Sequence, residues 1–279
     1  SAMATKYLGA QFDIHGGGMD LLFPHHESEI AQSTICNHSA PVRYWIHNNM
    51  ITINGRKMGK SYNNVIKLTE LFSGAHPLLE KAFHPMTIRF FILQTHYRST
   101  LDFSNEALLA SEKGLKRLWD AYENLRKIDI NSLIDSNVNV DRETSVITNN
   151  INHYLSQLSD FMNDDFSTAK VLANLFELVP IINSIKNDEN NARVAVSFSS
   201  IEKLKSNFKI YLEDIFGLKS VSEADNTKLQ GVMQLLIDIR KEAKGKKDFV
   251  TSDKIRNQLA QLGITLKDET GGDMSWSVE

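Results

Sequence analysis

The strongest constraint on the fold lies near the start of the chain, where an apolar segment, three consecutive glycines and a proline follow one another. Phe12 and Ile14 alternate with polar residues and predict a short strand. Gly16–Gly18 predict a loop, and Pro24 suits the first position of a helix that runs to about Asn37. A strand, a glycine loop and a helix N-terminus are typical of a site for the phosphate or ribose of a nucleotide. Taken alone, three consecutive glycines are more often a plain flexible turn.

Side chains with ligand chemistry flank this loop. Asp20 can accept hydrogen bonds from a sugar hydroxyl. His25 and Glu29 are four residues apart and share a helix face, the spacing that two ligands of one metal ion need. Further along, Ile51–Gly55 predicts a hairpin turn that leads into the basic sequence Lys57–Ser61. Taken singly, a His-x-x-x-Glu pair is more often a surface pair, and a basic loop is more often solvated charge.

Taken together and in this order, the two motifs resemble those of a known family. The chain reads His-Gly-Gly-Gly-Met-Asp-Leu-Leu-Phe-Pro-His-His-Glu-Ser-Glu-Ile-Ala-Gln over residues 15–32 and Lys-Met-Gly-Lys-Ser over residues 57–61. This pair is similar to the signature of the cysteinyl-tRNA synthetases, which are class I aminoacyl-tRNA synthetases. The resemblance continues through residues 93–99, 164–168 and 263–264, and therefore covers essentially the whole chain.

The resemblance implies a ligase that activates L-cysteine with ATP and Mg²⁺ and transfers it to tRNA(Cys). Lys57 and Lys60 are implied to be catalytic, because preorganised cations stabilise the charge that develops on the α-phosphate and the departing pyrophosphate. Gly59 stands where the family usually has serine, and it adds backbone freedom to the loop. The implied ATP-binding residues are His15, Gly16, Gly17, Gly18, Asp20, Met58 and Lys60. For His15, a role in capping the loop is an open alternative.

The resemblance also implies a zinc ion that is held by His25, Glu29 and two cysteines. Zinc prefers thiolate strongly, so a direct bond to the substrate sulfur separates cysteine from serine. Neither family cysteine is present here. The one cysteine, Cys36, is not at a ligand position, and we expect it to be reduced and buried in its helix. His26 and Glu27 are the neighbours most easily mistaken for the ligands. We expect weak or no zinc binding by this chain alone.

The family's first half, with its His-Ile-Gly-His nucleotide signature, is not in this sequence. We therefore interpret the chain as the C-terminal portion of a synthetase and expect it to be inactive alone. The predicted fold class is mixed and mainly α. It combines the C-terminal half of a Rossmann-type α/β domain, an antiparallel helical bundle and a small α+β C-terminal domain.

The predicted organisation has four regions. Residues 1–66 form the second half of the Rossmann-like catalytic domain, with a strand over Val42–Asn48. Residues 67–103 form a connecting helical region, with the loop Lys57–Ser61 (the lysine loop) just before it. Residues 104–219 form a tRNA-binding bundle, and residues 220–279 form a small anticodon-recognition domain.

In the bundle, Ser104 is a predicted N-cap, and helices are expected at about 105–126, 147–162, 167–187 and 197–216. A linker is expected at 220–226, and a hairpin near the C-terminus.

The formal net charge is −3, so no global basic field marks a nucleic-acid partner. RNA binding must then depend on local clusters of cations. The predicted tRNA contacts are Arg240, Lys241, Lys244, Lys246, Lys247 and Trp276. An indole can stack on an unpaired base, but Trp276 is as well suited to pinning the terminal hairpin onto the preceding helix.

No run of apolar residues approaches the ~20 residues needed to span a bilayer. We expect no membrane association, a cytoplasmic location and a monomer. Two other functions fit parts of the sequence. A related ligase that joins cysteine to an amino sugar shares the metal helix and the lysine loop, but it has no need of residues 220–279. A non-catalytic tRNA-binding fragment has no need of Lys57 and Lys60.

Overall fold

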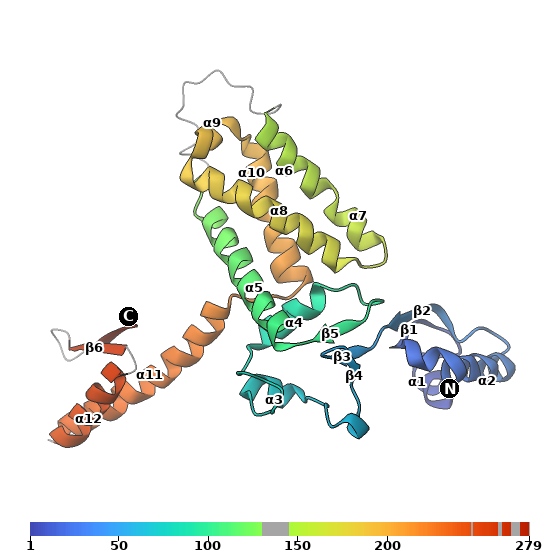
Figure 1. The fold of residues 1–279 in the computed structure, drawn as a ribbon, viewed down its shortest axis with the longest axis horizontal. Coiled ribbons are helices and arrows are strands. Elements are labelled where there is room, and N and C mark those ends of the chain that lie inside the picture. The colour runs from blue at the N-terminus through green and yellow to red at the C-terminus, as the bar shows by residue number, and fades with distance from the viewer. Residues whose placement is uncertain (130–144, 247, 262–263, 269–273, 279) are drawn as a thin grey trace. The chain divides into compact units, whose positions relative to one another are not determined.

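The computed structural model describes residues 1–129, 145–246, 248–261, 264–268 and 274–278, and it is mainly helical (Figure 1). The chain divides into two compact units, Ser1–Lys219 and Ser220–Glu279, which are described separately here.

The first unit begins with a strand–helix–strand motif. After α1 (Ala2–Leu8), strand β1 (Phe12–Gly18) pairs in parallel with β2 (Val42–Asn48). The connection contains the short turns η1 (Met19–Leu21) and η2 (Leu22–His26) and the helix α2 (Glu27–Asn37). Parallel strands need such a crossover. The predicted strand over Val42–Asn48 is confirmed.

The prediction of a glycine loop is wrong, because the three glycines are the C-terminal half of β1. Gly16, Gly17 and Gly18 are paired with Ile46, His47 and Asn48 of β2. A Cβ atom at Gly17 would collide with the imidazole ring of His26, and one at Gly18 would collide with the carboxylate of Asp20. Gly17 is therefore required by the close approach of the buried His26 ring, whereas the exposed Asp20 could move away from a Cβ atom at Gly18 and one at Gly16 would meet only an ordinary contact.

A small sheet with the order β4-β3-β5 follows, made of β3 (Ile51–Ile53), β4 (Arg56–Lys57) and β5 (Leu101–Phe103). The hairpin predicted at Asn54-Gly55 is confirmed, with φ of 50° and 75° at the two turn residues. Asp102 holds this turn, since its Oδ1 accepts hydrogen bonds from Thr52 Oγ1 and the Gly55 amide, each at 2.7 Å.

The exposed turn η3 (Lys60–Tyr62) follows β4, and two short helices, α3 (Leu68–Ser73) and α4 (Pro85–Leu93), pack beside this sheet. A shared apolar core joins the sheet to the helices. Its buried members are Ile53, Leu71, Phe83, Ile88, Phe91, Leu101, Phe103 and Leu108. Met58 of the lysine loop packs against this core, which anchors the loop to the sheet and helices.

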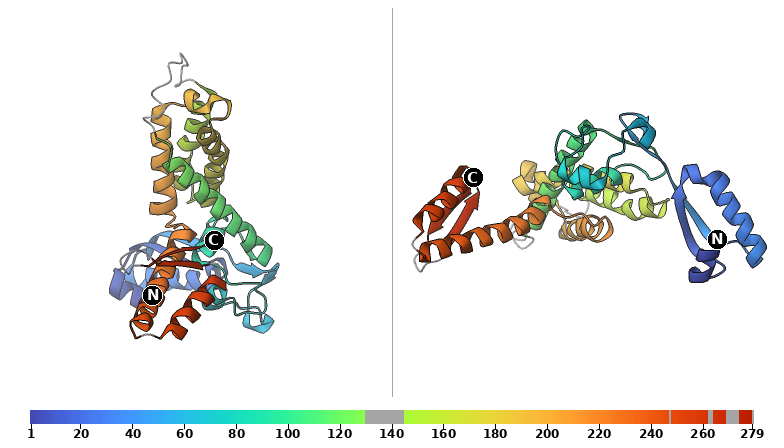
Figure 2. Two further views of the ribbon diagram at one scale, coloured as in Figure 1. Left: turned by 90° about the vertical axis from the view of Figure 1, so that its left-hand side faces the viewer. Right: turned by 90° about the horizontal axis from the view of Figure 1, so that it is seen from below.

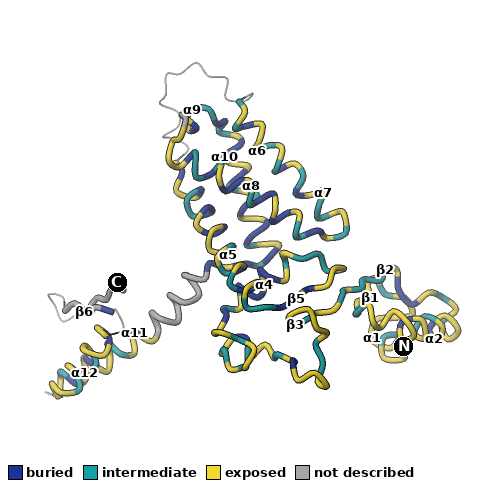
Figure 3. The backbone as a smooth tube through the Cα atoms, in the orientation of Figure 1, coloured by how far each residue is buried: buried dark blue, intermediate teal, exposed yellow. Residues whose placement is uncertain are grey.

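The helical bundle contains α5 (Asn105–Arg126), α6 (Val146–Ser156), α7 (Leu158–Asn163), α8 (Thr168–Asn187), η5 (Glu189–Asn191), α9 (Ala192–Ala195), α10 (Phe198–Phe208) and η6 (Lys209–Ile215). The predicted cap is confirmed, because Ser104 Oγ accepts from the Ala107 amide at 3.2 Å. Figure 3 shows dark stripes of buried residues along these helices, whereas the β1–α2–β2 region is largely exposed.

Helix α8 would be long and apolar enough to cross a membrane by length and composition alone, although polar residues such as Lys170 and Glu177 interrupt its apolar sequence. In this fold it lies in the bundle and contributes to its core. The buried residues of α8 are Val171, Leu172, Asn174, Leu175, Leu178, Val179, Ile182 and Ile185.

A set of polar contacts ties the segment that follows α4 to the loop before α8. Asp165, with φ of 60°, accepts a hydrogen bond from Tyr97 Oη at 2.5 Å, and its Oδ2 lies 2.6 Å from Arg98 Nε. These bonds, first from Tyr97 and then from Arg98, lower the pKa of the Asp165 carboxyl. His96 Nε2 also lies 3.1 Å from the Asp165 carbonyl oxygen.

The second unit contains α11 (Val221–Gly245), α12 (Phe249–Gln261) and an antiparallel pair, β6 (Ile264–Asp268) and β7 (Met274–Val278). Figure 2 shows α12 folding back beside α11. The predicted terminal hairpin is confirmed. The predicted linker at 220–226 is wrong, because α11 already begins at Val221. A small core of Met233, Leu259 and Ile264 holds this unit together.

Candidate functional site

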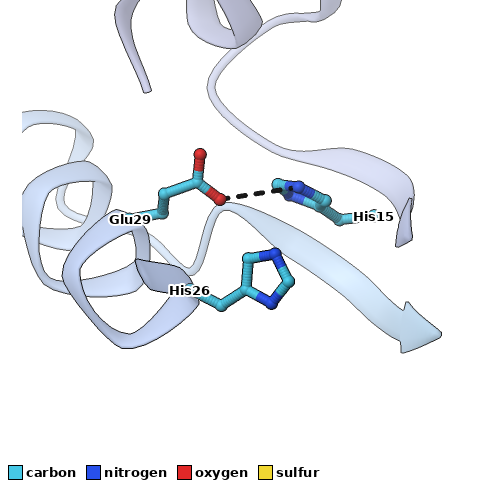
Figure 4. Close-up of side chains that lie close together, drawn as sticks. All are labelled: His15, His26 and Glu29. Atoms are coloured by element: carbon cyan, nitrogen blue, oxygen red, sulfur yellow. Dashed lines mark ion pairs between the residues drawn. The ribbon is translucent and has the colours of Figure 1, made fainter. Parts of the chain in front are cut away.

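Three side chains from successive elements meet beside the glycine strand: His15 from β1, His26 from η2 and Glu29 from α2 (Figure 4). One nitrogen or oxygen from each lies within 4.8 Å of the others. His15 Nε2 is 3.5 Å from Glu29 Oε2. The strand–helix crossover brings these residues together, because the chain turns back after β1 and places Glu29, in the first turn of α2, beside His15.

His26 is the buried member of this group, at 2% exposure. Its Nδ1 lies 2.9 Å from Nε2 of His47, so one ring donates and the other accepts. Burial, followed by the nearby His47, lowers the pKa of His26. Trp45, two residues before His47 on the same face of β2, stacks on His15 with ring centroids 4.4 Å apart. The rings of β1 and β2 therefore form one continuous aromatic and imidazole surface.

Glu29 lies between two histidines. Its Oε2 faces His15, while its Oε1 lies 3.8 Å from Nε2 of His25, whose side chain is 61% exposed. Oε2 is buried and has no hydrogen-bond partner among the described residues. A buried carboxylate oxygen without a donor is costly, and a cation would satisfy it. Two or three imidazoles and one carboxylate are a donor set that suits zinc.

Sequence reasoning selected His25 and Glu29 as ligands and placed His15 in the nucleotide site. The structure brings Glu29 close to His25, as the four-residue spacing predicts, but also to His15 and His26. No spacing rule could find His15, since it lies on a strand and reaches Glu29 only through tertiary packing. Asp20 is exposed on η1, and its carboxylate turns back toward Gly18.

The expectation that Cys36 is buried is wrong, because the cysteine is exposed. It lines a hollow of about 560 Å³ between α1 and α2, together with residues such as Thr5 and Gln32. Helix α2 is poor in apolar residues and buries only Ser33, so most of its surface is left open. Cys36 is not a member of the cluster of His15, His26 and Glu29.

The lysine loop leaves β4 and enters the 3₁₀ turn η3. The side chains of Lys57 and Lys60 are exposed, while Met58 packs against the apolar core. The side chain of Asn64 holds the loop backbone through two hydrogen bonds. It accepts from the Gly59 amide at 2.9 Å and donates to the Lys57 carbonyl at 3.1 Å. Within the described residues, no hydrogen bond or ion pair engages the side chain of either lysine.

The basic cluster proposed for the tail is divided by the structure. Arg240 is 2% exposed, so it is not available to hold an RNA backbone, which corrects the prediction. It lies on the buried face of α11, where Ile237 and Ala243, three residues to either side, are also buried. Lys241 is exposed, and Lys244 is half-buried.

Of the remaining predicted tail contacts, the structure describes the side chain of Lys246 but not those of Lys247 and Trp276. Lys246 is exposed and pairs with Glu242 at 2.6 Å. Lys247 lies outside the described residues. Trp276 is opposite Leu266 in the β6–β7 register, and its side chain lies outside the described part of the chain.

The structure also shows a basic hollow that sequence reasoning missed. Lys113, Lys116 and Arg117 on α5 line a depression of about 310 Å³, together with Asp120, Ala121, Asn124 and Asn183. Among the described residues, none of the three cations has an ion-pair partner. Their spacing of three and four residues places them on one face of the helix, and this signal was available in the sequence.

Comparison with known families and structures places these features in context. Residues 1–113 match the family model described as "tRNA synthetases class I (C) catalytic domain", and residues 157–218 match the DALR domain. The chain also resembles the "Cysteine--tRNA ligase" of Porphyromonas gingivalis, with 50% identity over 98% of the chain and 53% of that protein. The corresponding protein of Bacteroides thetaiotaomicron is 49% identical over the same shares. The chain therefore spans about half the length of these curated relatives.

A solved structure supports the fold. The agnB2 LeuRS of Agrobacterium radiobacter K84, in a ternary complex with tRNA and LeuAMS, matches 72% of this chain and 25% of its own chain. The TM-score is 0.51 at 15% sequence identity, so the likeness concerns the fold alone.

Proposed function

Since this chain belongs to the cysteinyl-tRNA synthetase family of class I aminoacyl-tRNA synthetases, we propose that the full-length protein containing it joins L-cysteine to tRNA(Cys) with ATP and Mg²⁺. One structural observation carries this proposal. In the first unit, His15, His26 and Glu29 form a cluster that could hold a metal ion, with His25 at its edge. The same unit carries a loop that presents Lys57 and Lys60, whose side chains have no partner within the described residues. Metal selection of a thiol and cationic stabilisation of phosphates are the two requirements of cysteine activation.

In the proposed reaction, the cysteine carboxylate attacks the α-phosphorus of ATP, and pyrophosphate leaves. Lys60 and Lys57 would stabilise the negative charge that accumulates on the phosphate oxygens. Their side chains are exposed and without partners in the described structure, so binding ATP would not require breaking existing ion pairs. Gly16–Gly18 would let the nucleotide lie against the β1 backbone. His15 would stand at the edge of that surface, and Asp20 would accept from a ribose hydroxyl.

The zinc ion is a proposal of its own. Its ligands in this chain would be His25 and Glu29, because the exposed ring of His25 forms its one ion pair within the described residues with Glu29 and makes no hydrogen bond there. When bound, the metal would supply a Lewis-acid site that prefers thiolate over hydroxyl. Glu29 Oε2, which is buried and unsatisfied, supports a cation at this position. His26 is already bonded to His47 and would act as a support for the site.

Two regions support tRNA as the acceptor. The bundle presents Lys113, Lys116 and Arg117 around one hollow, and the second unit presents the exposed Lys241 and Lys246. Exposed lysines and arginines can hold an RNA backbone through its phosphates. An acceptor as small as an amino sugar would leave both regions without a role, which favours tRNA over the related amino-sugar ligase. A soluble cytoplasmic monomer fits a partner of this kind.

The proposed function is tested with the purified full-length protein. Cysteine-dependent exchange of pyrophosphate into ATP is expected, followed by cysteinylation of tRNA(Cys) and not of a glucosamine-type acceptor. Both reactions are measured with radiolabelled substrates. Exchange without any tRNA charging, combined with coupling to the amino sugar, would replace the proposed function by the alternative one.

Deleting residues 220–279 from the full-length enzyme is expected to leave pyrophosphate exchange within about twofold and to raise the KM for tRNA about tenfold. The second unit has its own core, so its removal leaves the core around β3 and α4 intact. Discrimination against tRNAs with altered anticodons should also weaken, because an unpaired loop offers bases for stacking. Initial rates of aminoacylation at varied tRNA concentration provide the measurement.

A matched control replaces Lys241 and Lys246 by alanine in the intact second unit. A smaller rise in the KM for tRNA is expected there, since both lysines are exposed and the rest of the second unit is retained. If the deletion instead abolished pyrophosphate exchange, residues 220–279 would belong to the catalytic fold and the proposed division of the chain would fail.

A further inference from the structure

The lysine loop is held by a buried polar side chain that no part of the proposed mechanism uses. Asn64 is only 8% exposed, whereas the four residues before it, Lys60–Asn63, are all exposed. A buried amide requires hydrogen-bond partners. The partners of Asn64 are both backbone groups of the loop that carries the two lysines.

The two bonds enclose Met58. Asn64 Oδ1 accepts from the Gly59 amide at 2.9 Å, and Asn64 Nδ2 donates to the Lys57 carbonyl at 3.1 Å. Together they fix the peptide groups on either side of Met58. Gly59 directly precedes Lys60, so the same amide fixes where the backbone of Lys60 begins.

The turn that follows brings Asn64 back under the loop. The Tyr62 amide donates to the Gly59 carbonyl at 3.0 Å, and the Asn63 amide donates to the Lys60 carbonyl at 3.1 Å. Asn63 then adopts a left-handed conformation, with φ of 50°, which reverses the chain. Because of this reversal, the side chain of Asn64 reaches the backbone of Lys57 and Gly59, which precede Lys60 in the chain.

Asparagine is well matched to this position. Its short side chain offers one acceptor and one donor without charge. Aspartate of the same size would keep the bond from the Gly59 amide but would lose the donor to the Lys57 carbonyl. Leucine would fill a similar volume and lose both bonds, leaving two backbone groups unsatisfied.

We propose that Asn64 is a positioning residue that sets the backbone of the lysine loop and thereby holds Lys57 and Lys60 where charge develops during adenylate formation. The proposal rests on the proposed function for its catalytic consequence. Gly59 has the greatest backbone freedom of the loop residues. The hydrogen bond with Asn64 therefore restricts the loop at the residue that would otherwise be most flexible. Lysines that are preorganised stabilise a transition state without reorganisation at the moment of reaction.

The structural part is tested by hydrogen exchange at the Gly59 amide, read by fragment mass spectrometry on the full-length enzyme. Exchange is expected to be slow in the wild type and in Asn64→Asp, which both keep the acceptor. It should be about 10-fold faster or more in Asn64→Leu, which loses it. Equal exchange in all three proteins would overturn the proposal.

The functional part is tested by cysteine-dependent pyrophosphate exchange on the same proteins. Asn64→Leu should lower kcat about 10- to 100-fold, since a small misplacement of catalytic groups has that effect. The KM for cysteine should stay within about twofold, because Asn64 does not belong to the proposed amino-acid site. Asn64→Asp should give an intermediate kcat and keeps the test valid if the leucine variant does not fold.

Asn63→Gly is the matched control. It changes the exposed neighbour of Asn64, and glycine accepts the left-handed backbone of that position, so kcat and Gly59 exchange should both match the wild type. A normal kcat in Asn64→Leu despite fast Gly59 exchange would overturn the positioning role. A wild-type enzyme without cysteine-dependent exchange would overturn the proposed function instead, while the hydrogen-exchange result would still decide whether Asn64 holds the loop.

Discussion

Replacing Lys60 with alanine in the full-length enzyme is expected to slow adenylate formation by about two orders of magnitude, which corresponds to ~3 kcal/mol of lost transition-state stabilisation. The cation is exposed and without a partner in the described structure, so its removal should not disturb folding. Cysteine binding should change little, because the lysine loop contacts the nucleotide in the proposed mechanism. Single-turnover formation of cysteinyl adenylate is the direct measurement, and the Kd for cysteine is measured alongside it.

Lys67→Ala provides the control for this experiment. Lys67 is also an exposed cation and lies shortly after the loop, just before α3, so the variant changes the net charge equally without touching the loop. Its rate should match that of the wild type. An unchanged single-turnover rate in Lys60→Ala would remove Lys60 from the catalytic role and transfer that role to Lys57.

His25→Ala in the full-length enzyme is expected to lose most of its bound zinc and to lower the preference for cysteine over serine by about 100-fold or more. The side chain of His25 is 61% exposed and lies 3.8 Å from Glu29 Oε1, so alanine removes the proposed ligand without opening a cavity. Zinc content is measured by elemental analysis of the purified variant. The preference is measured as the ratio of kcat/KM values for the two amino acids.

The paired variant is His26→Gln, which removes the neighbouring ring. His26 is buried and bonded to His47, so this change should reduce stability more than zinc content. Full zinc occupancy in His25→Ala, together with loss of zinc in His26→Gln, would assign the ligand to His26. That result would make the cluster of His15, His26 and Glu29 the metal site.

Several elements of the fold could be predicted from the sequence because their causes are local. The strand Val42–Asn48 is apolar and alternating, and the turn Asn54-Gly55 consists of residues that tolerate positive φ. Ser104 has a hydroxyl that caps the next helix. The motif around His25 and Glu29 places two side chains on one helix face by spacing alone. Each of these depends on fewer than about ten neighbouring residues, which one window of sequence contains.

Other features depend on contacts between distant segments, and the sequence alone misassigned them. The glycines at 16–18 were interpreted as a loop, although they belong to a strand. The His26 ring lies where a Cβ atom of Gly17 would be. Cys36 was expected inside and lies outside, because α2 buries little of its surface. Arg240 was placed in a basic surface cluster, but the packing of α11 in the second unit buries it.

The sequence by itself determined the family, the order of the motifs and the residue types of the proposed chemistry, because these are properties of short, specific strings. Tertiary structure decided which histidines surround Glu29, which cations reach the surface and which side chain holds the lysine loop. The physical reason is that His15 and Glu29, or Asn64 and Gly59, become neighbours only after backbone pairing and chain reversal have brought them together. Burial and hydrogen bonding are properties of that arrangement, and residue type alone does not specify them.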